Sequence, residues 1–198
     1  MAKWTPDRIP KEPHIAKRAK LRFYEALSNA ETYLEFGSGG STIYACENCP
    51  NLKHVISVES FKEFLEAVKQ KTGNNQKLIP LFIDVGPVKR WGYPKASEFK
   101  ECWIDYPTQV WNEVPSSCIA DLVLIDGRWR VACFLASIQY LQPGTTIFFD
   151  DYKNRTNYHV VEKYIEPTTL HGTLAEFVIP DQEFKVLHDF KKYIRDPR

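Results

Sequence analysis

A glycine-rich turn closes the first strongly apolar segment of the chain, at residues 35–42. It reads EFGSGGST, and a segment with helical periodicity follows it. Glycines let the backbone turn tightly and approach a ligand closely, and the start of a helix offers unpaired N–H groups. A dinucleotide site would need a third glycine where Thr42 stands, and the carboxylate of Glu35 would repel a phosphate. The turn therefore favours a nucleoside without phosphate groups over a dinucleotide such as NAD.

Acidic side chains end the next three strand-like segments. These residues are Glu59, Asp84 and Asp126. Because ligands of open α/β sheets bind outside the carboxyl ends of the strands, we expect these acids near the glycine-rich turn. Glu59 follows Gly37 by 22 positions (59 − 37), a distance at which an acid can accept hydrogen bonds from ribose hydroxyls. Asp84 could accept one from an adenine amino group. Together with the turn, the acids predict a nucleoside site.

Two more carboxylates, Asp150 and Asp151, follow the fifth strand-like segment. With Asp126 they would supply three oxygen ligands, which could hold Mg²⁺ and orient a hydroxyl-bearing substrate. In an alternative interpretation Asp126 binds an amine of the ligand and Asp150 caps a helix. Asp151 then forms an ion pair with Arg128 or Arg155. The residues alone leave both possibilities open.

Candidates for direct acid–base chemistry lie in the same region. Asp150, Tyr158 and His159 could each move a proton, although a single histidine after a strand end is more often a surface or capping residue. Arg128 and Arg130 lie beside them, and a guanidinium recognises a carboxylate or phosphate through its fork of N–H groups. These arginines could bind an anionic substrate, or they could pair with the neighbouring aspartates.

The elements that must position these residues alternate along the chain. Strand-like segments are 32–36, 54–58, 78–85, 120–126, 145–150, 174–179 and 184–190, and segments of helical periodicity are 42–49, 61–72, about 97–112 and 129–141. Nearly continuous apolar strands are buried on both faces, as in a parallel sheet covered by helices. The short turn at 180–183 predicts an antiparallel hairpin of the last two strands. We therefore expect an α/β fold.

The chain divides into an N-terminal arm with a basic helix (1–30) and a main domain (31–198). Seven basic residues fall within 1–22, namely Lys3, Arg8, Lys11, Lys17, Arg18, Lys20 and Arg22. They would form a solvated helix face or a basic lid over an anionic substrate. The segment 86–118 carries five Trp and Tyr residues and is long for a connection between strands. It would be a lid on the acceptor side of the site or a surface for homo-oligomer formation.

Composition excludes several classes of protein. The 198 residues include 26 Lys+Arg and 25 Asp+Glu, a balance that disfavours a dedicated nucleic-acid binder. With 43% hydrophobic and 14% aromatic residues the chain can bury a core, so global disorder is excluded. No segment approaches the roughly 20 apolar residues of a membrane span, and the N-terminus lacks the apolar region of a secretory signal. The five cysteines then indicate reduced thiols in a cytoplasmic protein.

From about Thr32 to Asp151 the chain resembles the class I S-adenosylmethionine (SAM)-dependent methyltransferases. Residues 35–41 are similar to their first motif, with Ser41 where a third glycine is frequent, and 121–126 (DLVLID) is similar to their fourth. The resemblance implies a doubly wound, Rossmann-like, mostly parallel sheet of seven strands, with an antiparallel C-terminal strand and helices on both faces. That agrees with the hairpin expected above.

The resemblance also implies a cofactor and a set of residues that bind it. These are Glu35, Gly37, Ser38, Gly39, Ser41, Thr42, Glu59, Ser60, Asp84, Val85, Asp126 and Arg128. In this interpretation Glu59 binds the ribose, Asp84 lies on the adenine side, and Asp126 lies near the methyl donor. Asp126, Asp150 and Tyr158 are the catalytic candidates.

The expected activity is O-methylation of a small molecule. Acids at the ends of the fourth and fifth strands resemble the metal site of catechol-type O-methyltransferases, which implies Mg²⁺ bound by Asp126, Asp150 and Asp151. The proton-accepting lysine of those enzymes is replaced here by Trp129. That departure favours, as the alternative, a catalytically inactive methyltransferase-like binding protein. An RNA methyltransferase guided by the basic helix and an NAD-dependent oxidoreductase are further alternatives.

Overall fold

The computed structural model describes residues 4–115 and 117–198. Lys3, one of the seven basic residues expected in the arm, lies outside this range. The strands are β1 (Thr32–Phe36), β2 (His54–Glu59), β3 (Leu78–Phe82), β4 (Leu122–Ile125), β5 (Thr146–Phe149), β6 (Thr169–His171) and β7 (Leu174–Val178). The α-helices are α1 (Lys17–Asn29), α2 (Gly40–Asn48), α3 (Lys62–Lys71), α4 (Asp105–Thr108), α5 (Val110–Glu113), α6 (Arg130–Tyr140) and α7 (Leu187–Tyr193).

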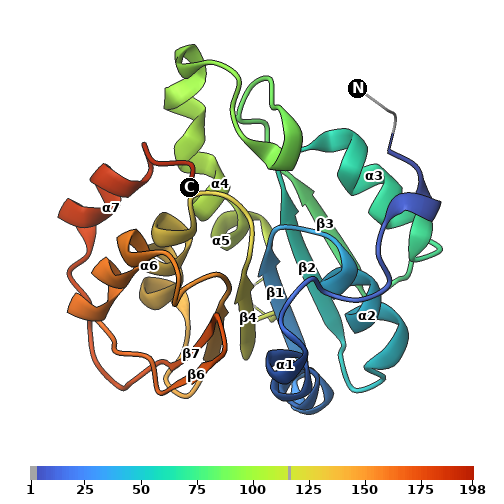
Figure 1. Cartoon of the computed structure of the whole chain (residues 1–198), viewed down its shortest axis with the longest axis horizontal. Coiled ribbons are helices and arrows are strands. Elements are labelled where there is room, and N and C mark those ends of the chain that lie inside the picture. Colours follow the sequence, from blue (N-terminus) through green and yellow to red (C-terminus); the bar gives the residue numbers. More distant parts are fainter. Residues whose placement is uncertain (1–3, 116) are drawn as a thin grey trace.

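The seven strands form one sheet in the order β3-β2-β1-β4-β5-β7-β6. The pairs from β3 through β5 are parallel, whereas β7 is antiparallel to both β5 and β6. The order reverses between β1 and β4, and in such sheets a ligand binds at that reversal, beyond the carboxyl ends of the strands. In Figure 1 the green segment that follows β3 stands above these carboxyl ends.

Alternate residues of the strands point into two cores. On one face Tyr33, Leu122 and Phe148 pack with buried side chains of α1 and α2. On the other face Leu34 and Val123 pack with the helical segments between α4 and α7. Helices therefore cover both faces of the sheet, which confirms the expected doubly wound architecture. Among the described residues no helix is long and apolar enough to cross a membrane.

The antiparallel hairpin is present, but its expected position was wrong. Its strands are β6 and β7, joined around Gly172, and 184–190 contributes no strand. Val186 and Phe190 are both buried while His188 between them is exposed, and this spacing of four residues belongs to a helix. That segment accordingly enters α7. The β6 strand is only three residues long and half exposed, so it carries almost no apolar signal.

The expected helix over 97–112 is broken into short pieces. A 3₁₀ segment spans 97–104, and α4 and α5 follow it with four residues each. The basic helix expected within residues 1–30 is α1. It buries Ala19, Phe23 and Leu27 on the sheet, so its basic side chains form the outer face.

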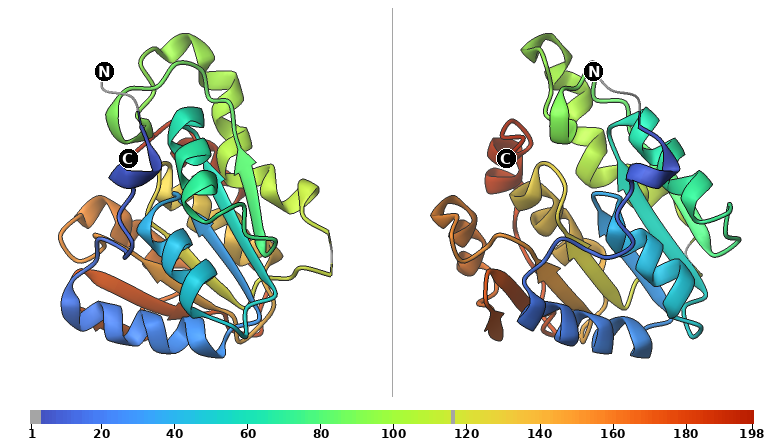
Figure 2. Two further views of the ribbon diagram at one scale, coloured as in Figure 1. Left: turned by 90° about the vertical axis from the view of Figure 1, so that its right-hand side faces the viewer. Right: turned by 45° about the vertical axis from the view of Figure 1, so that its right-hand side comes forward.

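The N-terminal arm ahead of α1 crosses the ends of α2 and α3 (Figure 2). Trp4 packs edge-on against Phe64 of α3, and Ile9 is buried with Ile43 of α2. The carbonyl of Glu12 approaches Gly40 so closely that a Cβ atom there would lie 1.9 Å from it. The arm therefore packs directly on the start of α2, beside the glycine-rich turn.

Candidate active site

The turn after β1 and the turn after β4 touch at the strand-order reversal. Gly37 has φ +104°, and a Cβ atom on it would lie 2.7 Å from the Cα of Gly127. Only glycine satisfies both the backbone angle and the contact. Ser38 and Gly39 continue the turn into α2. The site expected from the glycine-rich motif thus lies between β1 and β4.

Glu59 links the end of β2 to this turn. One carboxylate oxygen accepts hydrogen bonds from the backbone N–H groups of Ser60 (2.7 Å) and Phe61 (2.9 Å). The other accepts one from the N–H of Ser38 at 3.3 Å. Burial raises the pKa of Glu59, and these N–H groups act against that shift. The carboxylate is therefore held at the site, next to the buried Ser60.

The segment after β3 lies over Glu59. Lys89 and Tyr93 close a small loop, in which the N–H of Lys89 donates to the Tyr93 carbonyl at 2.7 Å. A Cβ atom on Gly92 would lie 2.9 Å from Ser60 Oγ and 3.7 Å from Glu59 Oε1. We call residues 88–94 the cover loop. It belongs to the aromatic segment that was expected to form a lid or a surface for homo-oligomer formation.

Asp84 and Val85 lie just beyond β3. Asp84 is exposed, and its carboxylate accepts a hydrogen bond from the N–H of Gly86 at 3.0 Å. Val85 is fully buried in the core. An exposed carboxylate with one local donor keeps free lone pairs for a ligand.

Glu35 lies beneath the turn and is fully buried. Its carboxylate accepts hydrogen bonds from the hydroxyls of Tyr33, Ser41, Thr42 and Ser57. Thr42 Oγ1 in turn accepts one from the N–H of Gly39 at 2.8 Å. Glu35 thus organises the turn from below. Ser57, a small polar residue inside an apolar strand, was the sequence signal for this network.

The pKa of Glu35 predicts a pH-dependent stability. Burial raises the pKa of this carboxyl to about 7, against the four hydroxyl donors. Between pH 4.5 and 7 the folded state then binds more protons than the unfolded chain, so the free energy of unfolding falls as pH rises. Across this pH range the free energy of unfolding should fall by about 3 kcal/mol in total. Urea denaturation from pH 5 to 7.5 should show a shallower pH slope for Glu35→Gln. The exposed Glu63→Gln is the control, and an unchanged slope in Glu35→Gln would refute this assignment.

Arg130 holds the carboxylates of Asp126 and Asp151. Its guanidinium lies 3.0 Å from Asp126 and 3.4 Å from Asp151, and Arg155 also pairs with Asp151, at 2.7 Å. Arg130 is 3% exposed. A guanidinium buried between the carboxylates takes the place that a cation would need. Among the described residues no three His, Cys, Asp or Glu side chains form a group that could hold a metal ion. The geometry does not fit the expected Mg²⁺ site of Asp126, Asp150 and Asp151.

Asp150 differs from its two neighbours. Its side chain is buried, and Oδ1 has no hydrogen-bond partner among the described residues. The residue begins a turn after β5, so it caps no helix there. Burial, and then the charge of Asp126, raise the pKa of Asp150 to about 7. A buried carboxyl with this pKa and one oxygen without a hydrogen-bond partner has the properties of a general base.

Tyr158 and His159 have different surroundings. The buried Tyr158 accepts a hydrogen bond from Arg155 at 3.0 Å, close to Asp151. His159 stacks on Tyr152, and its Nε2 lies 3.2 Å from the Tyr152 carbonyl. Trp129, which replaces the expected lysine, packs in the core against Trp103 and does not take a lysine's role.

Arg128 lies under the cover loop. Its guanidinium stacks 4.2 Å from the ring centre of Tyr93 and is 8% exposed. Nε and Nη1 have no hydrogen-bond partner among the described residues. The two arginines of the 126–130 segment thus have different environments. The guanidinium of Arg130 has hydrogen-bond and ion-pair partners, whereas Nε and Nη1 of Arg128 have no hydrogen-bond partner among the described residues. The sequence, in which Arg128 and Arg130 lie two positions apart, could not show which of them pairs with the aspartates.

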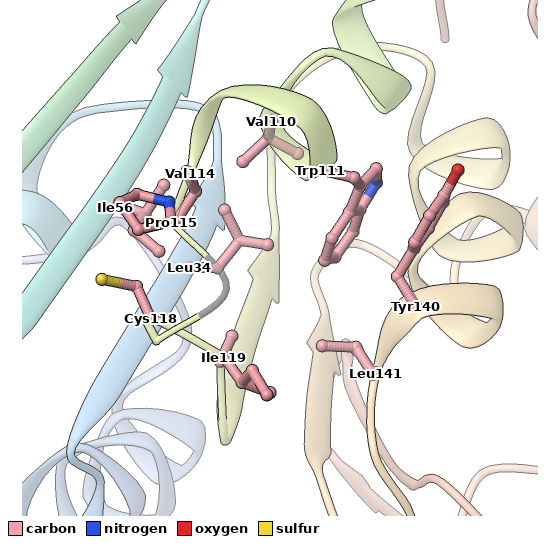
Figure 3. Close-up of a pocket in the computed structure, with 11 residues that line it drawn as sticks. Leu34, Ile56, Val110, Trp111, Val114, Pro115, Cys118, Ile119, Tyr140 and Leu141 are labelled. Carbon is pink, nitrogen blue, oxygen red and sulfur yellow. The ribbon is translucent and has the colours of Figure 1, made fainter.

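An apolar cavity of about 140 Å³ lies elsewhere, towards the amino ends of the strands. Leu34, Ile56 and Cys118 line it beside the stacked rings of Trp111 and Tyr140 (Figure 3). No carboxylate, histidine or basic side chain is among its described lining residues. This cavity is separate from the carboxyl-end site.

The comparisons with known proteins agree with this geometry. The chain is 32% identical to a methyltransferase-like protein of Silicibacter pomeroyi, with a TM-score of 0.86 over 95% of this chain and 99% of that one. No protein-family model and no curated protein matches the chain. The chain belongs to the class I SAM-dependent methyltransferases. Within that class, it is a relative of the Silicibacter pomeroyi protein along nearly its whole length.

More distant structures share only the fold. An O-methyltransferase from Bacillus cereus, in complex with S-adenosylhomocysteine (SAH), is 17% identical to this chain. The TM-score is 0.52, over 83% of this chain and 81% of that one. An RNA methyltransferase from Salinibacter ruber, in complex with SAH, is 16% identical with a TM-score of 0.50, covering 87% and 97%. Since one is an O-methyltransferase and the other an RNA methyltransferase, the fold does not identify the acceptor of this protein.

Proposed function

We propose that the protein is a cytoplasmic methyltransferase that transfers the methyl group of SAM to an oxygen of a small molecule. The observation that carries the proposal is the position of Glu59. Its carboxylate is hydrogen-bonded to the glycine-rich turn at the strand-order reversal. An acid there suits the vicinal hydroxyls of a ribose. All five cysteines are free thiols, which agrees with the cytoplasm.

The residues around the turn fit SAM. Gly37 and Gly127 leave no side chain between the two turns, so backbone can contact the ligand. We assign the ribose to Glu59 and Ser60, and the adenine to Asp84, since Val85 is buried in the core. Glu35 supports the turn from below through Ser41 and Thr42. Thr42 fills the position of the third glycine of a dinucleotide site, which disfavours NAD.

Asp150 is the proposed general base. SAM would supply an electrophilic methyl group, and the acceptor hydroxyl must lose its proton. Asp150 Oδ1 is buried, unpaired and adjacent to Asp126, so it can take that proton. Tyr158 and Arg155 close the same side of the site. Mg²⁺ has no part in this assignment, because Arg130 already neutralises Asp126 and Asp151.

The arrangement of the basic helix favours a small acceptor over RNA. Arg22 of α1 pairs with the buried Glu176 at 2.5 Å, and Lys20 pairs with Glu12 at 2.9 Å. These two charges are engaged in ion pairs within the protein, which leaves fewer of the seven basic side chains to bind phosphates.

A methyl-transfer assay tests the activity. Labelled SAM would be incubated with the protein and a panel of small phenols and hydroxy acids, with product and SAH both measured. Turnover that requires Asp150 supports the proposal. SAH binding without transfer to any acceptor would favour the second candidate, an inactive binding protein. That candidate is supported by Trp129 in the place of a lysine.

A further inference from the structure

Arg128 carries a buried guanidinium that lies near the carboxylates of Glu59 and Asp126 without a hydrogen bond to either among the described residues. Its side chain is more than nine-tenths buried, and neither Nε nor Nη1 finds an acceptor among the described residues. Burying an ion without a partner is costly, so such groups usually face a ligand or a counter-ion. The guanidinium therefore calls for an anionic group.

The acids nearest to Arg128 have other partners. Glu59 accepts from three backbone N–H groups, and Asp126 pairs with Arg130 at 3.0 Å. The backbone oxygen of Arg198 also has another partner, because it accepts a hydrogen bond from the N–H of Arg130 at 3.1 Å. None of these groups supplies an acceptor to the Arg128 fork.

The ring of Tyr93 fixes the orientation of this fork. The guanidinium carbon lies 4.2 Å from the ring centre, a cation–π contact from the cover loop. The Arg128 Cγ also lies against Gly92, at 3.5 Å from the position of a Cβ atom there. A guanidinium held by its face keeps the N–H groups in its plane available as donors to a carboxylate or phosphate.

We propose that Arg128 binds a carboxylate or phosphate group of the methyl acceptor, so that the substrates of this protein are small anionic hydroxyl compounds. This inference rests on the proposed function. The contact with Tyr93 favours the acceptor as the source of the anion, since that ring comes from the segment that covers the site. The carboxylate of the cofactor is the other possible source.

The test is calorimetric titration of inorganic phosphate into the SAH-saturated protein at constant ionic strength. Arg128→Met keeps an unbranched apolar stem and removes the charge, and Arg128→Lys keeps the charge without the fork. We expect phosphate affinity to fall at least tenfold in Arg128→Met. Arg90→Met, which removes an exposed cation of the same cover loop, should leave it unchanged. Equal phosphate affinity in the wild type and Arg128→Met would overturn the proposal.

A second titration distinguishes the two sources of the anion. SAH carries the amino-acid carboxylate, whereas 5′-methylthioadenosine lacks it. If Arg128→Met weakens SAH tenfold but leaves methylthioadenosine unchanged, Arg128 binds the cofactor and the acceptor assignment is wrong. If wild type binds neither nucleoside, the proposed function fails, and phosphate titration of the ligand-free protein still tests Arg128. Thermal denaturation confirms folding, and we expect Arg128→Met to melt no lower than wild type.

Discussion

Replacing Asp150 by asparagine is expected to lower kcat by about a thousandfold, the usual scale of a lost general base. Asparagine has the same shape and keeps the backbone carbonyl that Arg130 binds at 2.7 Å, so the fold should persist. Since Asp150 accepts the proton and is not assigned to the cofactor, the Kd for SAH should change less than threefold. Steady-state kinetics on the first active acceptor, with SAH calorimetry beside it, measures both quantities.

Asp151→Asn is the matched control for Asp150. Asp151 is the next residue, has a left-handed backbone (φ 58°) that asparagine tolerates, and forms ion pairs with Arg130 and Arg155. Its change should lower kcat less than tenfold. Another residue must be the base if kcat of Asp150→Asn stays within tenfold of the wild-type value, or if it falls no further than kcat of Asp151→Asn.

Gly37→Ala is expected to destabilise the fold by about 3 kcal/mol or more and to abolish SAH binding. The added Cβ would lie 2.7 Å from backbone of Gly127, and no flexible side chain can move to relieve that contact. Separating the two turns would displace the N–H groups at the start of α2. Chemical denaturation and SAH titration measure the two effects.

Gly144→Ala separates the steric contact from backbone strain. Gly144 also has a positive φ, +87°, but a Cβ atom there would meet no atom within 4 Å. Replacing Gly144 should lower the free energy of unfolding only by the strain of a left-handed backbone, about 1–2 kcal/mol. Equal destabilisation by the two alanines would mean that the contact between the two turns has no energetic importance.

Residues that act through local patterns could be predicted from the sequence. The glycine-rich turn and Glu59 follow strands whose apolar runs are unmistakable. The turn lies at the reversal of strand order, and Glu59 is hydrogen-bonded to it. The chemical type of the turn also indicated its ligand class, because Thr42 breaks the dinucleotide pattern. These features depend on spacing within one strand–turn–helix unit, which a sequence displays directly.

Features that depend on distant contacts could not be predicted. Asp126 and Asp151 are neutralised by Arg130, and no spacing rule says which arginine of the 126–130 segment turns towards them. The same holds for Arg128, whose contact with Tyr93 joins two segments 35 positions apart (128 − 93). The misplaced hairpin has another cause, since the three residues of β6 contain too few apolar side chains to mark a strand.

Titration calorimetry with SAH tests the central claim, a SAM site at the carboxyl ends of β1, β2 and β4. We predict a micromolar Kd, about −8 kcal/mol, with NAD binding far more weakly and with no enhancement by Mg²⁺. Glu59→Ala should weaken SAH at least tenfold, because it removes the acceptor for the ribose hydroxyls. Absence of binding at millimolar SAH, or unchanged affinity in Glu59→Ala, would contradict the assignment of this site.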